Sequence, residues 1–138
     1  MIRIRTSIIG LIFAAITGCG TATDPSSGTG AKAATLRFYQ ALIRHDTTEA
    51  YAAIAPESKA KVTPEPFAKL AKEYLRGLGF EAKTVHIHAC DEHGTEAIAH
   101  VVLSGTGAHR HRFKDTITLH RDATGWAVVL PAKFGKSR

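Results

Sequence analysis

The side chains best suited to acid–base chemistry are a histidine and an aspartate, His100 and Asp115, set within apolar strand patterns. A histidine beside a carboxylate in an apolar pocket can act as a general base, with the carboxylate orienting its ring. The same pair can instead be a buried structural pair, or Asp115 can lie at an open rim. His100 and Asp115 are therefore candidate catalytic residues only if the fold places both on one face of a sheet.

Eight histidines in 138 residues also raise the question of a metal site. His86, His88 and Cys90 alternate along one predicted strand, so they would share a face at a spacing of about 6.6 Å per two residues. Zinc sites usually take a further ligand from another element, and the neighbouring strand offers only apolar side chains beside this triplet. We therefore expect half-exposed histidines, with no metal and no cofactor.

A third group of residues is basic. Arg110, Arg112 and Lys114 alternate along another predicted strand, and residues 132–138 form a basic tail. Arg3 and Arg5 lie in the predicted export signal, and without them the formal net charge falls from +6 to +4, which favours anionic partners such as membranes or envelope polymers. The alternative is a solvated charged face without a specific partner. Nucleic acid is not an expected partner, because the chain begins with an export signal, described below.

Three predicted helices precede the strands. The first is amphipathic and ends near His45. The second has Asp46 as its N-cap, with a glutamate three residues on as in a capping box, and stops at Pro56. The third has Pro64 as its first residue and ends at Gly77, the usual positions of these residue types in a helix.

From Lys83 onward the apolar period changes from that of a helix to that of a strand. Short glycine-containing turns then separate four predicted strands, near 83–90, 96–104, 108–120 and 126–131. Helices followed by antiparallel hairpins indicate an α+β fold, with three N-terminal helices packed on a curved antiparallel sheet of about four strands.

The turns also predict a register, in which Ile87 pairs with His100, Val102 with His111, and Leu119 with Val128. In this register Asp115 is the diagonal neighbour of His100. The helix-covered face would be mostly apolar, and its pocket would be lined by His100, His111, Phe113, Asp115 and Trp126. The opposite face would carry His86, His88, Cys90, Arg110, Arg112 and Lys114.

Three segments, Leu36–Leu42, Asp46–Ala55 and Gly125–Pro131, resemble the nuclear transport factor 2-like superfamily. This superfamily includes ketosteroid isomerase and many small bacterial lipoproteins, and the resemblance covers residues 33–131. It implies a cone-shaped domain with a pocket between the concave sheet face and the helices. It implies no particular reaction, because members include enzymes, binding modules and assembly domains. Members often have a short strand between the second and third helices, for which this sequence offers no clear candidate.

The first 18 residues have the order of a secretory signal: arginines, a short apolar run, then small residues. The run is too short to span a membrane. Ile16-Thr17-Gly18-Cys19 resembles the bacterial lipobox, with Ile16 in place of the usual leucine. The resemblance implies cleavage before Cys19 and its acylation by palmitate-type chains, and Gly20 at the next position implies sorting to the outer membrane. The alternative is an ordinary signal followed by an accidental cysteine.

The chain is thus expected to have four parts. Residues 1–18 form the signal, and 19–32 form a flexible tether with a reach of roughly 20 Å. Residues 33–131 form the domain, and 132–138 form the basic tail. Lipidation of Cys19 would leave Cys90 without a partner, so no disulfide is expected.

These observations predict a membrane-tethered, non-enzymatic binding or assembly module of the bacterial cell envelope, on the periplasmic side of the outer membrane. Its partners would be the membrane, and a small apolar ligand or an envelope protein or polymer. The alternative is a small isomerase- or dehydratase-type enzyme that uses His100 and Asp115.

Overall fold

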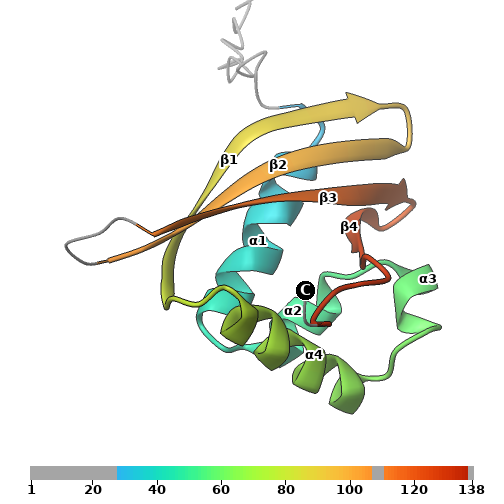
Figure 1. Cartoon of the computed structure of the whole chain (residues 1–138). Helices are drawn as coiled ribbons and strands as arrows, with labels where there is room; N and C mark the ends of the chain where they lie inside the picture. Colours follow the sequence, from blue (N-terminus) through green and yellow to red (C-terminus); the bar gives the residue numbers. More distant parts are fainter. Residues whose placement is uncertain (1–27, 107–110, 137–138) are drawn as a thin grey trace, which may run out of the picture.

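The computed structural model describes residues 28–106 and 111–136, which form an α+β domain (Figure 1). Helices α1 and α4 lie on one face of a curved antiparallel sheet whose strand order is β1-β2-β3-β4. The elements are α1 (Ala31–Ile43), α2 (Thr47–Ala52), α3 (Pro56–Lys59), α4 (Pro64–Gly77), β1 (Ala82–His93), β2 (Glu96–Gly105), β3 (Arg112–Asp122) and β4 (Gly125–Val129). The predicted fold class is confirmed.

The predicted signal, Cys19 and most of the predicted tether lie outside the described residues. Within the part of the chain that the structure describes, no helix is long and apolar enough to cross a membrane.

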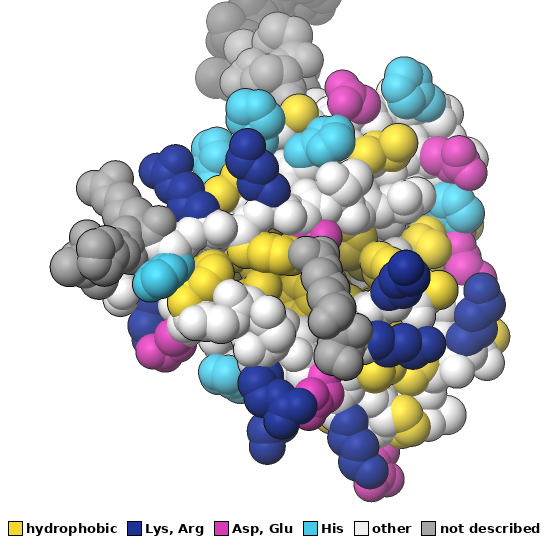
Figure 2. All heavy atoms as spheres, in the orientation of Figure 1, with side chains coloured by type: hydrophobic (Ala, Val, Ile, Leu, Met, Phe, Trp, Pro, Cys, Tyr) yellow, Lys and Arg dark blue, Asp and Glu magenta, His cyan; other side chains and the backbone are white. Residues whose placement is uncertain are grey.

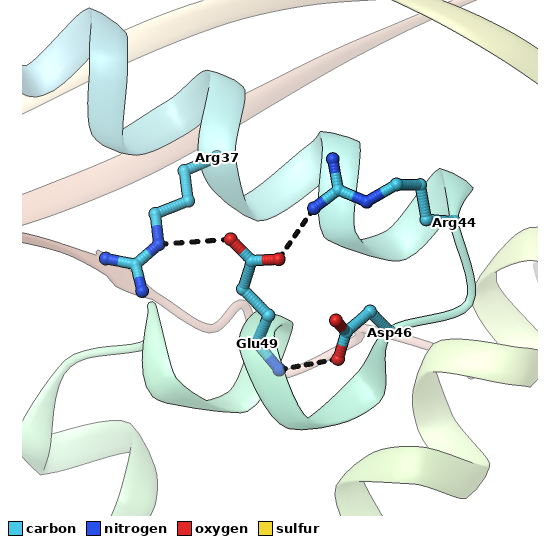
Figure 3. A network of polar contacts seen from close by, with 4 residues as sticks. All are labelled: Arg37, Arg44, Asp46 and Glu49. Carbon is cyan, nitrogen blue, oxygen red and sulfur yellow. Dashed lines mark hydrogen bonds and ion pairs between the residues drawn. The ribbon is translucent and has the colours of Figure 1, made fainter.

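The corner between α1 and α2 forms around Asp46 and Glu49 (Figure 3). The Asp46 carboxylate accepts a hydrogen bond from the Glu49 amide at 2.9 Å, which confirms the predicted N-cap. The Glu49 carboxylate does not complete the capping box. It pairs with Arg44 at 2.6 Å and with Arg37 at 3.4 Å, both from α1 or its C-terminal end. The glutamate thus ties α2 to α1.

The chain between α2 and α4 differs from the prediction of a helix that stops at Pro56. Helix α2 ends earlier, and Pro56 begins the short helix α3, because a proline at the first helical position loses no intrahelical hydrogen bond. Between them, Ala53 and Ala55 form backbone hydrogen bonds with Val128 on β4, at 2.9 and 2.7 Å. Ile54 therefore makes a parallel bridge to Val128, which replaces the short strand that the sequence did not reveal.

The sheet register is as predicted only at its last pair. Leu119 lies opposite Val128 as expected. Val102, however, lies opposite Lys114 rather than His111, a slip of three residues. Ile87 lies opposite Val101 rather than His100, a slip of one. Both slips are odd, and side chains alternate along a strand, so β2 presents the opposite face from the one predicted.

The buried side chains of β2 are Ala97, Ala99, Val101 and Leu103. Ile98, by contrast, is 44% exposed. One local reason for this change of face is the turn between β1 and β2. It is two residues long rather than five, with Gly94 at φ +62°. A second is the later start of β3, four residues beyond the prediction. The set that is buried contains no polar side chain, whereas the outward-facing set contains Glu96, His100 and Ser104.

The core lies between the concave face of the sheet and helices α1 and α4. Its largest buried side chains include Phe38, Tyr39 and Leu42 from α1 and Phe67 from α4. Phe134, from the segment predicted to be a basic tail, is also buried, with 6% of its surface exposed. The packed domain therefore continues beyond the predicted boundary at residue 131.

Candidate functional site

The polar centre of the concave face is the carboxylate of Asp115 on β3. It accepts hydrogen bonds from two tyrosine hydroxyls, that of Tyr39 on α1 at 2.9 Å and that of Tyr74 on α4 at 2.6 Å. Its other oxygen accepts from the amide of Thr116 at 2.9 Å. The interior side chain of Asp115 is thus joined to both helices that cover the sheet.

Tyr39 is the most enclosed member of this cluster, with 1% of its surface exposed. Burial raises the pKa of Tyr39 well above its ordinary value, and the neighbouring Tyr74 and Asp115 raise it further. The hydroxyl therefore remains protonated and continues to donate to Asp115. The sequence analysis placed Asp115 on this face but did not identify either tyrosine as its partner.

His100 does not reach this cluster, so the predicted His100–Asp115 pair is wrong. His100 lies on the outer face of β2 and is exposed, with its Nδ1 atom 3.2 Å from the Thr116 hydroxyl. Thr116 is the residue after Asp115 and points to the opposite side of β3. The odd slip of β2 therefore separates the two candidate catalytic side chains across the sheet.

Two of the other predicted pocket residues have partners away from Asp115, although Trp126 does pack against the core as predicted. His111 is exposed, and its ring stacks on Phe80 at 5.6 Å. Trp126 is half-buried, and its indole N–H donates to the Thr29 hydroxyl at 2.8 Å. Phe113, in contrast, lies on the inner face, where its ring meets Tyr74 edge-on at 6.4 Å.

Trp126 belongs to a polar clasp that holds the chain just before α1. The Glu92 carboxylate accepts from the backbone amides of Thr29 and Ala31, and Arg121 donates to the Thr29 hydroxyl at 3.1 Å. Partial burial raises the pKa of Glu92, but the hydrogen bonds from Thr29 and Ala31 and the charge of Arg121 together lower the pKa below its ordinary value. The clasp fixes where the preceding segment meets the domain, and no local sequence signal indicated it.

The predicted triplet His86, His88 and Cys90 is divided by a β-bulge. The register shifts between Ile87 and Ala89, so Cys90 pairs with the buried Ala99 and turns toward the core. His86 and His88 remain exposed on the outer face. Burial raises the pKa of the Cys90 thiol, and Glu92 and Asp91 raise it further. Among the residues that the structure describes, no three histidine, cysteine or acidic side chains are placed to hold a metal ion.

The outer face of the sheet gathers basic side chains, which we call the outer basic face. Its exposed members are His86, His88, His100, Arg112 and Lys114. His86 and Lys114 both lie opposite Val102, one from each neighbouring strand. Figure 2 shows histidines beside lysine and arginine side chains over the part of the molecule that the sheet forms. Arg110, predicted for the same surface, lies outside the described residues.

A separate open groove of about 390 Å³ lies between the end of α1 and the start of β1. Its lining consists of Gln40, Ile43, Arg44, Lys83, Thr84 and Val85. The Arg44 guanidinium already pairs with Glu49, and the Lys83 ammonium pairs with Glu81. The groove is therefore lined by cations whose charges already have partners.

His120 forms an ion-pair bridge between α3 and β2, with Glu57 at 2.5 Å and Glu96 at 3.1 Å. Partial burial lowers the pKa of His120, but the hydrogen bonds and charges of the two carboxylates outweigh it and raise the pKa overall. The stabilisation is thus complete below about pH 6.5, the ordinary histidine pKa, and is lost as the pH rises through the higher folded value.

We therefore expect wild-type protein to lose more unfolding free energy than His120→Gln between pH 6 and pH 9. The difference should stay below about 1 kcal/mol, because the His120 side chain is 43% exposed. Urea unfolding at both pH values measures it. His93→Gln, on the neighbouring hairpin, is the control and should behave as wild type. An equal pH dependence in His120→Gln would show that the bridge contributes nothing.

Comparison with solved structures identifies the architecture. An NTF2-like transpeptidase from Campylobacter jejuni matches with a TM-score of 0.57 at 15% identity, covering 72% of this chain and 97% of that one. The domain has the nuclear transport factor 2-like fold. A SEC-C motif-containing protein from Rhodopseudomonas palustris matches with a TM-score of 0.51 at 10% identity, covering 67% of this chain and 69% of that one. No protein-family model and no curated protein matches the sequence.

These likenesses establish the fold alone. A nuclear transport factor 2-like domain can serve as a binding module or as an enzyme, and the residues on its two sheet faces must decide between these roles.

Proposed function

We propose that this protein is a lipid-anchored, non-enzymatic binding module of the bacterial cell envelope, which binds anionic surfaces through its outer basic face. The observation that carries the proposal is which side chains lie on each of the two faces of the sheet. The predicted general base, His100, lies on the outer face beside Thr116, away from Asp115 at the centre of the cone. The alternative based on a His100–Asp115 pair therefore has no geometric support.

The inner face supports a structural role for Asp115. Its carboxylate accepts from Tyr39 and Tyr74, and the ring of Phe134 packs against Tyr74 at 4.8 Å. A general base must reach the proton that it removes. Here both tyrosine hydroxyls and an aromatic side chain of the same protein occupy the surroundings of the carboxylate.

The outer face supports binding to anions. Arg112 and Lys114 lie two residues apart on β3, so their side chains point to the same side. Exposed histidines on β1 and β2 flank them. A lipid anchor on Cys19 would bring this surface close to a bilayer, and a second, electrostatic contact strengthens the binding of an acylated protein to an anionic bilayer.

The test is sedimentation of the chain from residue 20, which lacks the anchor, with vesicles rich in phosphatidylglycerol. Each lysine or arginine near an anionic surface contributes about 1 kcal/mol, so Arg112→Gln with Lys114→Gln should weaken binding about thirtyfold. The matched control is Lys69→Gln with Lys72→Gln on α4, which removes the same charge from exposed positions elsewhere. Equal losses in both double variants would mean that net charge, rather than the outer basic face, drives binding.

A further inference from the structure

Ser104 on β2 lies at the centre of a group of polar side chains at one end of the outer basic face. Thr84 on β1 lies directly opposite it on one side, and Arg112 on β3 lies directly opposite it on the other. His86 and Lys114, two residues further along these strands, are its diagonal neighbours. All five side chains point outward, and each is exposed or half-buried. We call these five residues the Ser104 cluster.

The Ser104 cluster has a short side chain at its centre and longer ones around it. Residues directly opposite each other on antiparallel strands have Cβ atoms about 5 Å apart, and diagonal neighbours are about 7–8 Å apart. The long, flexible side chains of Arg112 and Lys114 can therefore converge over the hydroxyl of Ser104. The cluster thus places two cations, two hydroxyls and an imidazole around one point of the sheet.

The polar groups of the cluster are available to a ligand. Among the described residues, neither Arg112 nor Lys114 forms an ion pair, unlike the two cations that line the open groove. The hydroxyls of Thr84 and Ser104 likewise form no hydrogen bond with another described residue. No acidic side chain occurs at the outward-facing positions of this half of the sheet, which are 84, 86 and 88 on β1, 100, 102 and 104 on β2, and 112, 114 and 116 on β3. An anion would therefore meet donors that have no competing carboxylate beside them.

The number and type of these donors match one class of anion. A phosphomonoester has about two negative charges at neutral pH and three oxygens that accept hydrogen bonds. Arginine binds phosphate through two parallel N–H donors, and lysine binds it as a point charge. Arg112 and Lys114 would balance the two charges, and the hydroxyls of the cluster would donate to the remaining acceptor positions. A phosphodiester has one charge and one free oxygen fewer, so it would leave part of the cluster unused.

We propose that the Ser104 cluster is a binding site for a phosphomonoester group carried by a membrane lipid. This inference rests on the proposed function, because it uses the same face and the same two cations, and it adds which anion that face prefers. The helices that cover the sheet, α1 and α4, lie on its other face, so the surface of a bilayer can reach the cluster directly (Figure 1).

The test compares two anionic lipids in phosphatidylcholine vesicles of matched zeta potential. One lipid is phosphatidic acid, a phosphomonoester, and the other is phosphatidylglycerol, a phosphodiester. Sedimentation uses the chain from residue 20, which keeps every described residue. A hydrogen bond to a charged group changes an equilibrium by roughly tenfold or more, so wild type should bind the phosphatidic acid vesicles at least about tenfold more tightly.

A variant without the two hydroxyls tests the cluster at constant charge. Thr84→Ala with Ser104→Ala should remove most of the preference for phosphatidic acid. Its binding to phosphatidylglycerol should stay within about twofold of wild type, because Arg112 and Lys114 remain. The matched control is Thr116→Ala with Thr118→Ala, which removes two exposed hydroxyls of the same face outside the cluster. This control should keep the preference.

Equal binding of wild type to both kinds of vesicle would overturn this inference and leave the proposed function intact. A preference that survives the loss of both cluster hydroxyls, or that the control loses to the same extent, would also overturn it. Failure of the proposed function gives a different result, in which Arg112→Gln with Lys114→Gln weakens binding to phosphatidylglycerol no more than Lys69→Gln with Lys72→Gln.

A calorimetric titration with glycerol 3-phosphate tests whether the phosphate group belongs to a lipid. This soluble phosphomonoester has no acyl chains, so it should bind wild type at least about tenfold more weakly than the phosphatidic acid vesicles do, because a vesicle also meets the other basic side chains of the face. Equally tight binding would assign the cluster to a free phosphate ester, and the assignment to a lipid would be wrong.

Discussion

Val101→Asp should destabilise the domain by about 3–5 kcal/mol, the range for an uncompensated charge buried in a protein core. Val101 is 1% exposed on the inner face of β2. It lies directly opposite Asp115 on β3, so the new carboxylate would also meet a carboxylate across the strands, where like charges repel. Chemical unfolding monitored by circular dichroism measures the loss.

The adjacent position provides the control. Val102 points to the outer face and lies opposite both His86 and Lys114, so an aspartate there gains the cationic Lys114 as a neighbour and is not buried in the core. Val102→Asp should therefore change the unfolding free energy by less than about 1 kcal/mol. A larger loss at Val102 than at Val101 would restore the register in which His100 faces the pocket, and with it the catalytic alternative.

The second large expected effect is on labelling with a fatty acid, which should be either present or absent, and it tests the proposed anchor on Cys19. When the protein is produced in bacteria fed radioactive palmitate, wild type should be labelled and Cys19→Ser should not. The reason is that the lipobox cysteine is the acceptor of the lipid and no other side chain of the motif can replace its thiol. Labelling is read from the purified protein after gel electrophoresis.

Cys90→Ser is the matched control, because it removes the other cysteine of the chain and should leave labelling unchanged. Equal labelling of wild type and Cys19→Ser would contradict the anchor. Recovery of the labelled protein in the inner-membrane fraction alone would contradict only the sorting that Gly20 implies.

Local sequence signals were sufficient to predict the backbone features that a single residue type determines. Asp46 caps α2 as expected, because its carboxylate reaches the Glu49 amide within a single turn. Pro64 begins α4 as predicted. The inner and outer sides of β3 were also predicted correctly, since Ile117 and Leu119 alternate with polar residues and no other assignment buries them.

Strand β2 could not be assigned in this way, because both of its faces carry apolar side chains. The register predicted from the turn lengths placed Ile98 and His100 on the buried face, whereas the structure buries the residues that alternate with them. The small alanines of that set pack under the helices, and the polar members of the other set remain in water. A register chosen to minimise buried polar atoms, rather than by turn length, would have avoided the error.

The sequence by itself determined the class of the fold, the N-cap of α2, the first residue of α4 and the sides of β3 and β4, because these depend on residues close together in the chain. Only the tertiary structure decided which side chains meet at Asp115. Tyr39, Tyr74 and Asp115 come from α1, α4 and β3, and no periodicity within one element encodes their approach. The same holds for Phe134, whose burial depends on the rings of Phe67 and Tyr74 on α4, at least about sixty residues earlier in the chain. Contacts of this kind depend on how the elements pack. Among arrangements that the local sequence allows equally well, packing favours the one that buries the most apolar surface.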